Sequence, residues 1–281
     1  MLAQRANSYP VYIQSATLVT HIITCHILIV KLQLGMLGAA LSTNATYLMN
    51  MLLIDYLLRA NSRFCETRQP FQVKSVFYDW KSYLAIGLPS AMMVCFEWWA
   101  FEVLAVLSGY ISVAALAAEV VIINIVSFIF MMPLGISYAA SSLTGNYLGQ
   151  GKVNMARKFS QMTLLLNLIL SILIIFLLLL FHKELSSLFT TDPEIVDIVG
   201  QVLWIILAYV FVDGIHGVQA GIIRGLGRQK YGSIFTLVSY YLLGMPMALY
   251  FAFVLDQGVT GLWLGFTIAS AILDISFFVI I

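Results

Sequence analysis

Long apolar stretches alternate with short polar bursts along the whole chain. Several of these stretches exceed the roughly 18 apolar residues that mark a candidate transmembrane helix. A membrane β-barrel would instead alternate polar and apolar residues in short segments, whereas residues 164–181, LLLNLILSILIIFLLLLF, are almost uniformly apolar. We therefore predict an all-α, polytopic membrane protein with about eight transmembrane helices, at residues 10–30, 35–58, 82–108, 113–138, 160–181, 196–222, 232–255 and 259–281.

The composition indicates that the chain lies in a lipid bilayer, and it excludes several functional classes. The 281 residues are 61% hydrophobic and 10% charged, whereas a soluble domain is about one quarter charged. The net charge of +1 gives no reason to expect a nucleic-acid partner. The sequence contains no Walker A loop, GxSxG or HExxH motif, and its three cysteines have no CxxC spacing. We therefore expect no enzyme, no metal site and no cofactor.

The basic residues predict the orientation of the chain in the membrane, because cytoplasmic loops are enriched in Lys and Arg. Lys31 and Lys183 fall on one side, where the loop at 182–197 is acidic. The other side holds the N-terminus, every second loop and the remaining twelve cations: Arg5, Arg59, Arg63, Arg68, Lys74, Lys81, Lys152, Arg157, Lys158, Arg224, Arg228 and Lys230. Both termini are therefore predicted to be cytoplasmic.

A faint internal repeat and one long polar loop predict the domain organisation. Residues 35–58 begin GMLGAALS and residues 258–281 begin GVTGLWLG, a shift of 223 positions that pairs the first two spans with the last two. Parallel repeats of this kind occur in secondary transporters. We predict that residues 1–60 are the last two helices of an N-terminal lobe and that 82–281 form a complete six-helix C-terminal lobe. Residues 61–81 then form a cytoplasmic interlobe loop, which ends in an amphipathic interfacial stretch.

Ionisable residues inside a bilayer are costly and therefore mark candidate functional sites. Asp55 lies one turn from Arg59 at the end of its span, which predicts an interfacial ion pair. Glu119 lies two turns into its span, where a water-facing vestibule is the alternative to a functional role. The sequence leaves the role of Asp274 open. The predicted spans hold six carboxylates: Asp55, Glu97, Glu102, Glu119, Asp213 and Asp274.

Glu97 and Glu102 are the strongest candidates because both lie deep in one span, in CFEWWAFEVL. They stand about 24 and 31 Å along the helix from Lys81, at or beyond the middle of a core about 30 Å thick. Five residues correspond to about 140° around a helix, so the two side chains flank a cavity rather than chelate one ion. The local sequence supplies no cation, so we expect them to take up and release protons. The alternative is a pair of protonated acids hydrogen-bonded at a helix interface.

A third acid within a span and a pair of tryptophans are also candidates for the site. Asp213 lies about 16 Å from Arg224 along its helix, and His216 at i,i+3 is placed either to pair with it in a relay or to make a simple local hydrogen bond. Trp98 and Trp99 follow Glu97 directly. An aromatic face beside an acid suits an organic cation, although tryptophan also packs well against lipid.

Three stretches together resemble a known family. They are GLPSAMMVCFEWWAFEVLAVLSG at 87–109, MPLGISYAASSLTGNYLGQGKVNMARK at 132–158, and GIIRGLGRQKYG with YYLLGMP at 221–232 and 240–246. They are similar to the seventh, eighth, tenth and eleventh helices of the multidrug and toxic compound extrusion (MATE) family, particularly its eukaryotic branch. The resemblance implies a twelve-helix carrier with two six-helix lobes, of which this chain lacks the first four helices, so that a missing N-terminal segment is an expected partner.

The resemblance also implies an activity and a set of site residues. Members exchange organic cations or other amphipathic compounds for protons, and some use Na⁺, across plasma or vacuolar and vesicular membranes. The matching positions in this sequence are the acids Glu97, Glu102 and Asp213, together with Asn124, Tyr240 and Tyr241. Two alternatives stay open: a lipid-linked oligosaccharide flippase of related architecture, and a non-transporting truncated paralogue. The flippase would favour a cationic cavity, whereas the charges inside these spans are acidic.

Overall fold

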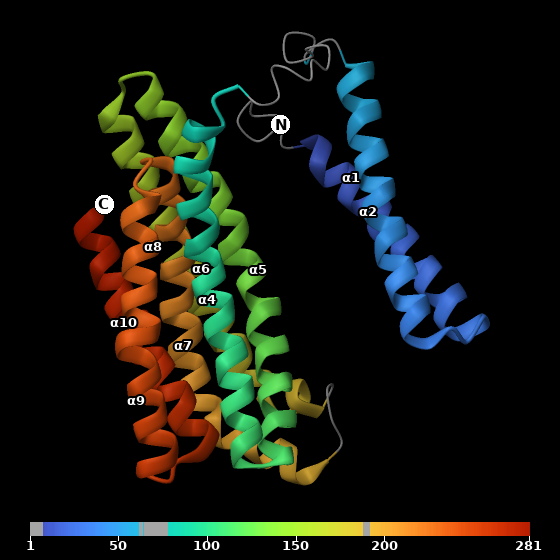
Figure 1. Ribbon diagram of the computed structural model, residues 1–281, viewed down its shortest axis with the longest axis vertical. Coiled ribbons are helices and arrows are strands. Elements are labelled where there is room, and N and C mark those ends of the chain that lie inside the picture. Colours follow the sequence, from blue (N-terminus) through green and yellow to red (C-terminus); the bar gives the residue numbers. More distant parts are fainter. Residues whose placement is uncertain (1–7, 62–63, 65–77, 188–191) are drawn as a thin grey trace. The chain divides into compact units, whose positions relative to one another are not determined.

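The computed structural model describes residues 8–61, 64, 78–187 and 192–281, and it divides the chain into two units, Met1–Tyr78 and Asp79–Ile281 (Figure 1). The described residues contain eight helices long and apolar enough to cross a membrane, which confirms the predicted all-α fold. The spans are Tyr9–Lys31, Gly35–Ala60, Trp80–Ile111, Val113–Gly149, Val153–Phe181, Pro193–Gly225, Gln229–Val254 and Gly258–Ile280.

The described part of the smaller unit contains a helical hairpin. Helix α1 (Ser8–Cys25) continues into a π-helical segment, η2 (His26–Lys31), and the chain then turns into α2 (Gly35–Ala60). The turn requires positive φ angles at Gln33 (50°) and Gly35 (52°), the region that glycine adopts without a steric penalty. A Cβ at Gly38 would lie 3.0 Å from the backbone of Leu28, so the two helices approach closely just after the turn.

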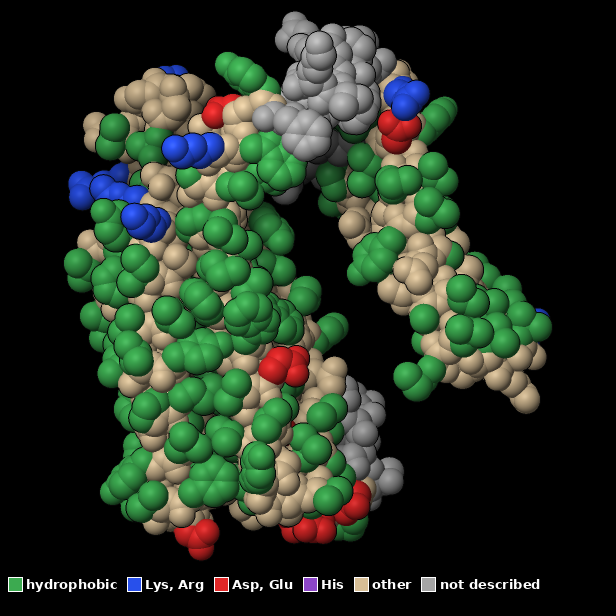
Figure 2. Space-filling view, viewed as in Figure 1, with side chains coloured by type: hydrophobic (Ala, Val, Ile, Leu, Met, Phe, Trp, Pro, Cys, Tyr) green, Lys and Arg blue, Asp and Glu red, His purple; other side chains and the backbone are tan. Residues whose placement is uncertain are grey.

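The larger unit is a helical bundle in which α7 is central. The chain runs through α4 (Trp80–Ile111), α5 (Val113–Gly149), α6 (Val153–Ser187) and α7 (Pro193–Gly225). Helix α7 packs against α5, α6 and α10 (Gly258–Ile280). Apolar side chains cover most of the middle of this unit, Lys and Arg gather near one end, and most of the acidic side chains in view lie at the other (Figure 2). This is the distribution expected of a membrane-spanning body with distinct ends.

Glycines on α7 allow an unusually close contact with α5. A Cβ at Gly221 would overlap the carbonyl oxygen of Ser137, and one at Gly225 would lie 2.7 Å from the carbonyl oxygen of Ser141. Small residues at helix interfaces permit such approaches in membranes, where close packing rather than hydrophobic burial drives helix association. Ser137 also donates to the Gly217 carbonyl at 2.5 Å and accepts from Arg224 at 2.8 Å, so polar contacts join the same two helices.

The seventh span is not a uniform α-helix. It consists of α8 (Gln229–Leu237), the π-helical segment η4 (Val238–Gly244), α9 (Met245–Leu249) and the π-helical segment η5 (Tyr250–Val254). The sequence predicts one span at 232–255, and Pro246 lies in the first turn of α9. Proline lacks the backbone donor and its ring collides with the preceding turn, and wide turns of this kind accommodate such breaks.

The turn before α10 repeats the geometry of the turn before α2. Asp256 and Gly258 have φ angles of 55° and 56°, at positions shifted by 223 from Gln33 and Gly35. The shift also maps the hydrogen bond from the Leu32 amide to the Ile27 carbonyl, at 2.9 Å, onto the 3.0 Å bond from Leu255 to Tyr250. These matched turns support the internal repeat inferred from the sequence.

Several helices extend further than the sequence predicts. The expected ends at 108, 138 and 222 move outward to Ile111, Gly149 and Gly225, and the expected start at 160 moves to Val153. Polar residues such as Asn146 end an apolar run but still permit helix, so hydropathy underestimates helix length. Most of the predicted interlobe loop and interfacial stretch lies outside the described residues.

Candidate functional site: an acid–histidine cluster in the larger unit

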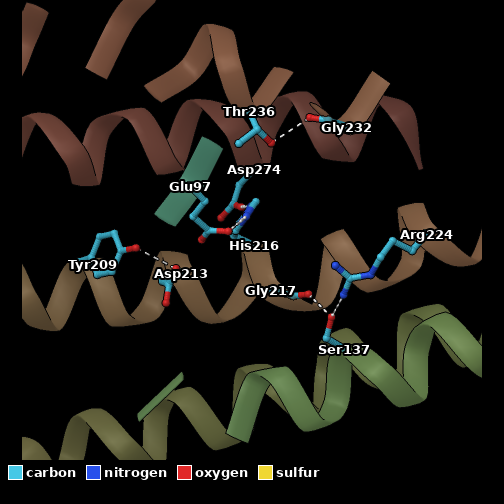
Figure 3. Close-up of polar contacts among 10 residues, drawn as sticks. All are labelled: Glu97, Ser137, Tyr209, Asp213, His216, Gly217, Arg224, Gly232, Thr236 and Asp274. Carbon is cyan, nitrogen blue, oxygen red and sulfur yellow. Dashed lines mark hydrogen bonds and ion pairs between the residues drawn. The ribbon is translucent and has the colours of Figure 1, made fainter. Parts of the chain in front are cut away.

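Three helices bring two acids to one imidazole inside the larger unit. Nε2 of His216 on α7 lies 3.5 Å from Oε2 of Glu97 on α4, and its Nδ1 lies 3.8 Å from Oδ1 of Asp274 on α10 (Figure 3). The side chains of Glu97, His216 and Asp274 are 14%, 2% and 9% exposed. A protonated imidazole at these distances would form an ion pair with each acid. When protonated, His216 supplies the cation that the local sequence around Glu97 lacks.

Asp213 lies one turn before His216 on α7 and is also buried. Its Oδ1 accepts a 2.9 Å hydrogen bond from the Tyr209 hydroxyl, four residues earlier on the same helix. The sequence offers pairing of Asp213 with His216 as one option, but the ring contacts Glu97 and Asp274 instead. Tyr209 occupies the role of local partner to Asp213.

Two polar atoms in this cluster have no hydrogen bond. Nδ1 of His216 and Oδ1 of Asp274 are buried and unsatisfied. Buried polar atoms are nearly always hydrogen-bonded, so an unsatisfied one indicates a specific cause, such as a functional role or a bound water. A group that must exchange partners during a reaction cycle is one such explanation.

A small cavity opens between Glu97 and Asp213. It has a volume of about 30 Å³ and is bordered by Glu97, Asp213, Trp98 and Phe101 from α4 and α7, with residues of α5 completing the wall. That volume holds about one water molecule. Trp98 is 45% exposed, so this indole forms the accessible edge of the cavity. The arrangement joins an aromatic surface to two acids.

The other residues suggested by the resemblance lie elsewhere. Glu102 is exposed on α4 and, within the described part of the chain, is not part of the cluster. Asn124 is exposed on α5 and donates to the Val120 carbonyl of its own helix at 2.7 Å. Tyr240 is fully buried with its ring against Phe266, the centroids being 4.7 Å apart. Tyr241 donates to the Phe96 carbonyl at 3.1 Å, directly beside Glu97.

Asp55 and Glu119 lie in different environments, one exposed and one buried. Asp55 forms an exposed ion pair with Arg59 at 2.9 Å, which confirms the predicted pair. Glu119 is fully buried, and its Oε2 accepts a 2.7 Å hydrogen bond from Nε1 of Trp263, whereas Oε1 has no partner. A water-facing vestibule around Glu119 is therefore wrong.

Sequence reasoning missed the role of Asp274 and the link between Tyr209 and Asp213. The i,i+4 spacing of Tyr209 and Asp213 on one helix face is a signal that could have found the second. It also missed a polar cavity of about 250 Å³ in the smaller unit, where His21 Nδ1 lies 2.9 Å from the Thr46 hydroxyl and Thr17 donates to Asn50 at 3.1 Å. Among the described residues, no group of three or more His, Cys, Asp and Glu is arranged to hold a metal ion.

Comparison with known proteins identifies the family. The MatE family profile matches residues 89–250, more than half of the 281 residues. The chain belongs to the MATE family. This membership confirms the resemblance of the sequence motifs, and the family is one of integral membrane transporters rather than of enzymes.

Relatives of this MATE chain include animal and plant proteins. Multidrug and toxin extrusion protein 1 of Homo sapiens is 33% identical over 248 residues, covering 88% of this chain and 43% of the relative. Protein DETOXIFICATION 14 of Arabidopsis thaliana is 31% identical over 259 residues, covering 92% of this chain and 53% of the relative. This MATE chain therefore spans about half of the length of these relatives.

Solved structures agree with the fold. The crystal structure of the eukaryotic MATE transporter AtDTX14 matches with a TM-score of 0.93 and 29% identity, covering 99% of this chain and 62% of that one. A mutant of the Vibrio cholerae MATE transporter VcmN matches with a TM-score of 0.80 at 17% identity, again over 99% of this chain and 62% of that one, which bears on the fold alone. Both matches support the helical arrangement of this MATE chain.

Proposed function

We propose that this MATE chain acts in cation-coupled antiport, with protons as the coupling ion, and exports organic cations or other amphipathic compounds. The observation that carries the proposal is the placement of Glu97, His216 and Asp274 from three helices around one buried point, with Asp213 beside it. Ionisable groups within a membrane mark transport pathways and proton relays by default.

Competition between a proton and a cationic substrate supplies the coupling. An organic cation lying against Trp98 is attracted by the ring face and by the carboxylate of Glu97. Protonation of Glu97 removes that negative charge and weakens binding of the cation. His216 holds Glu97 in place between the two events, and Asp274 on the other side of the imidazole adjusts the charge of the cluster.

The side chains around the cluster favour a proton over Na⁺ as the coupling ion. An alkali cation prefers a shell of oxygen ligands, as other hard cations do. An imidazole at the centre of the cluster offers nitrogen instead, and it repels a metal cation whenever it is protonated. A proton needs only one acceptor atom at a time, which these acids and the imidazole provide.

The composition of the cluster also disfavours the flippase alternative. A pyrophosphate-linked substrate needs cationic partners within the membrane, yet the buried cluster contains three acids and one histidine. The non-transporting alternative predicts that the cluster contributes only to helix packing. It differs from the proposal in one measurable respect, which is substrate flux.

We further propose that residues 82–281 act as one six-helix lobe and that residues 1–60 belong to another, connected by the loop at 61–81. The Lys and Arg side chains near one end of the larger unit support an orientation with that end in the cytoplasm (Figure 2). From the distribution of basic residues along the sequence we propose the same side for both termini. Cysteine labelling of a residue added at each terminus, in sealed vesicles with an impermeant reagent, tests the orientation.

A vesicle assay tests the proposed transport. The chain, preceded by four further N-terminal helices taken from a full-length relative, is reconstituted into liposomes with a pH gradient, and uptake of tetraethylammonium is measured. Glu97→Gln should abolish the gradient-driven uptake, because an amide has a similar shape but cannot bind and release a proton. Asp55→Asn is the matched control: it makes the same acid-to-amide change at an exposed ion pair and should leave uptake near the unchanged level. No gradient-driven uptake by the unchanged chain, or normal uptake by Glu97→Gln, would refute the proposal.

A further inference from the structure

The larger unit contains a second cavity at its basic end, away from the acid cluster. Its volume is about 500 Å³, and it lies where the C-terminal ends of α5, α7 and α10 meet the first turns of α6. Asn154, Arg157 and Gln161 line one wall from α6. Their i, i+3 and i+7 spacing places all three on one face of that helix.

The opposite wall of this cavity is apolar. Ile222 of α7 and Phe278 of α10 line it, together with Leu226 and Ile281, which directly follow these two helices. Phe278 is 57% exposed, so this wall continues into the lipid-facing surface of the unit. An occupant that matches both walls is amphipathic, with a polar group at α6 and a hydrocarbon chain along α7 and α10.

The charged side chains near this cavity favour an anionic ligand. The sequence contains no Asp or Glu between Glu119 and Glu184, or between Asp213 and Asp256, so α6 and the adjoining ends of α5 and α7 carry only cations there. Asp79 lies at the same end but belongs to the start of α4 and is bound by the Ser82 hydroxyl at 2.6 Å. Within the described residues, no carboxylate pairs with Arg157. Of the six cations in this part of the sequence, Arg157 lines the cavity; the six are Lys152, Arg157, Lys158, Arg224, Arg228 and Lys230.

We propose that this cavity binds an anionic phospholipid, with its phosphate at Arg157 and the α6 polar face and one acyl chain along the apolar wall. Three observations support this ligand: a cationic side chain, Arg157, that has no carboxylate partner among the described residues; an apolar wall that opens to the bilayer; and a location at the end of the membrane span, where headgroups lie. Basic pockets between transmembrane helices are suited to such headgroups. A free phosphate would use only the polar wall.

The test measures binding of defined lipids to the purified chain in a neutral detergent. Native mass spectrometry and the thermal unfolding midpoint are recorded with phosphatidylserine, with phosphatidylcholine and with inorganic phosphate. Phosphatidylserine should be retained as a bound lipid and should raise the midpoint, whereas the other two should do neither. Equal effects of phosphatidylcholine, or of inorganic phosphate at the same concentration, would overturn the proposal.

Variants then locate the bound lipid. Arg157→Gln should weaken phosphatidylserine binding about fivefold, the contribution of one basic residue at an anionic surface. Lys158→Gln removes the same charge from the next residue, which does not line the cavity, and should bind as the unchanged chain does. Gln161→Trp fills the cavity without changing any charge and should block binding. Unchanged binding by Arg157→Gln and Gln161→Trp would show that the lipid lies elsewhere.

Discussion

Gly221 on α7 offers a sharp test of the contact between α5 and α7. In Gly221→Ala the new Cβ would overlap the Ser137 carbonyl oxygen and would lie 2.6 Å from its hydroxyl and 2.9 Å from its carbonyl carbon. Two of these are backbone atoms, which cannot rotate away as a flexible side chain can. The substitution therefore forces the helices apart or distorts the Ser137 region.

The expected change in the free energy of unfolding combines two destabilising effects and one stabilising effect. Overpacking costs about 1–3 kcal/mol. Displacing Ser137 also weakens its 2.8 Å hydrogen bond from Arg224, and a bond to a charged group contributes about 1.5–3 kcal/mol. Alanine recovers about 1 kcal/mol because it is a better helix former than glycine. The balance is a loss of about 2 kcal/mol or more, which corresponds to a fall of about 4–8 °C in the unfolding midpoint of a body of this size.

The assay is thermal unfolding of the purified chain in detergent, with Gly200→Ala as the control. Gly200 lies on the same helix, and a Cβ there would meet nothing within 4 Å. Its replacement should stabilise the chain by about 0.5–1 kcal/mol through helix propensity alone. A midpoint for Gly221→Ala equal to or above that of Gly200→Ala would show that α5 and α7 are not in such close contact.

Three further predictions use other parts of the larger unit. Trp263→Phe should lower the free energy of unfolding by about 1–3 kcal/mol, because it leaves the buried Glu119 carboxyl without its donor; the loss should shrink in a Glu119→Leu background, and equal losses in both backgrounds would contradict the pairing. Gly258→Ala should cost about 1–2 kcal/mol in chemical unfolding, since φ there is 56°, and a neutral result would argue against this turn. His216→Gln should reduce pH-driven uptake of tetraethylammonium as Glu97→Gln does, and full activity would remove His216 from the proposed mechanism.

The sequence predicts the helices well because hydropathy is a local property of the chain. Eight spans follow from apolar length alone, and the repeated GMLGAALS and GVTGLWLG segments correspond to two turns of the same geometry. Helix ends are less predictable, since residues such as Asn146 leave the apolar pattern without ending the helix. The π-helical segments around Pro246 depend on how the surrounding helices accommodate the lost donor.

The sequence identifies candidate site residues within each helix, but it does not show which residues of different helices lie together. Depth in the span identifies Glu97 and Asp213 as candidates, and both are beside the small cavity. Asp274 has no charged neighbour in the sequence, because its partner His216 is on another helix. Glu102 has the depth of a site residue but is exposed, since the rotation of α4 relative to its neighbours is set by packing that no local pattern records.

The close approach of α5 and α7 has a mechanical consequence. Backbone atoms in contact along several turns resist sliding and rotation, so these two helices should move as one strut during any rearrangement. Asp213 and His216 belong to that strut, whereas Glu97 is carried by α4 and Asp274 by α10. The distances from His216 to Glu97 and to Asp274 are then expected to change when the bundle changes shape. Spin labels on α4 and α10, measured against a label on α7, would follow that displacement.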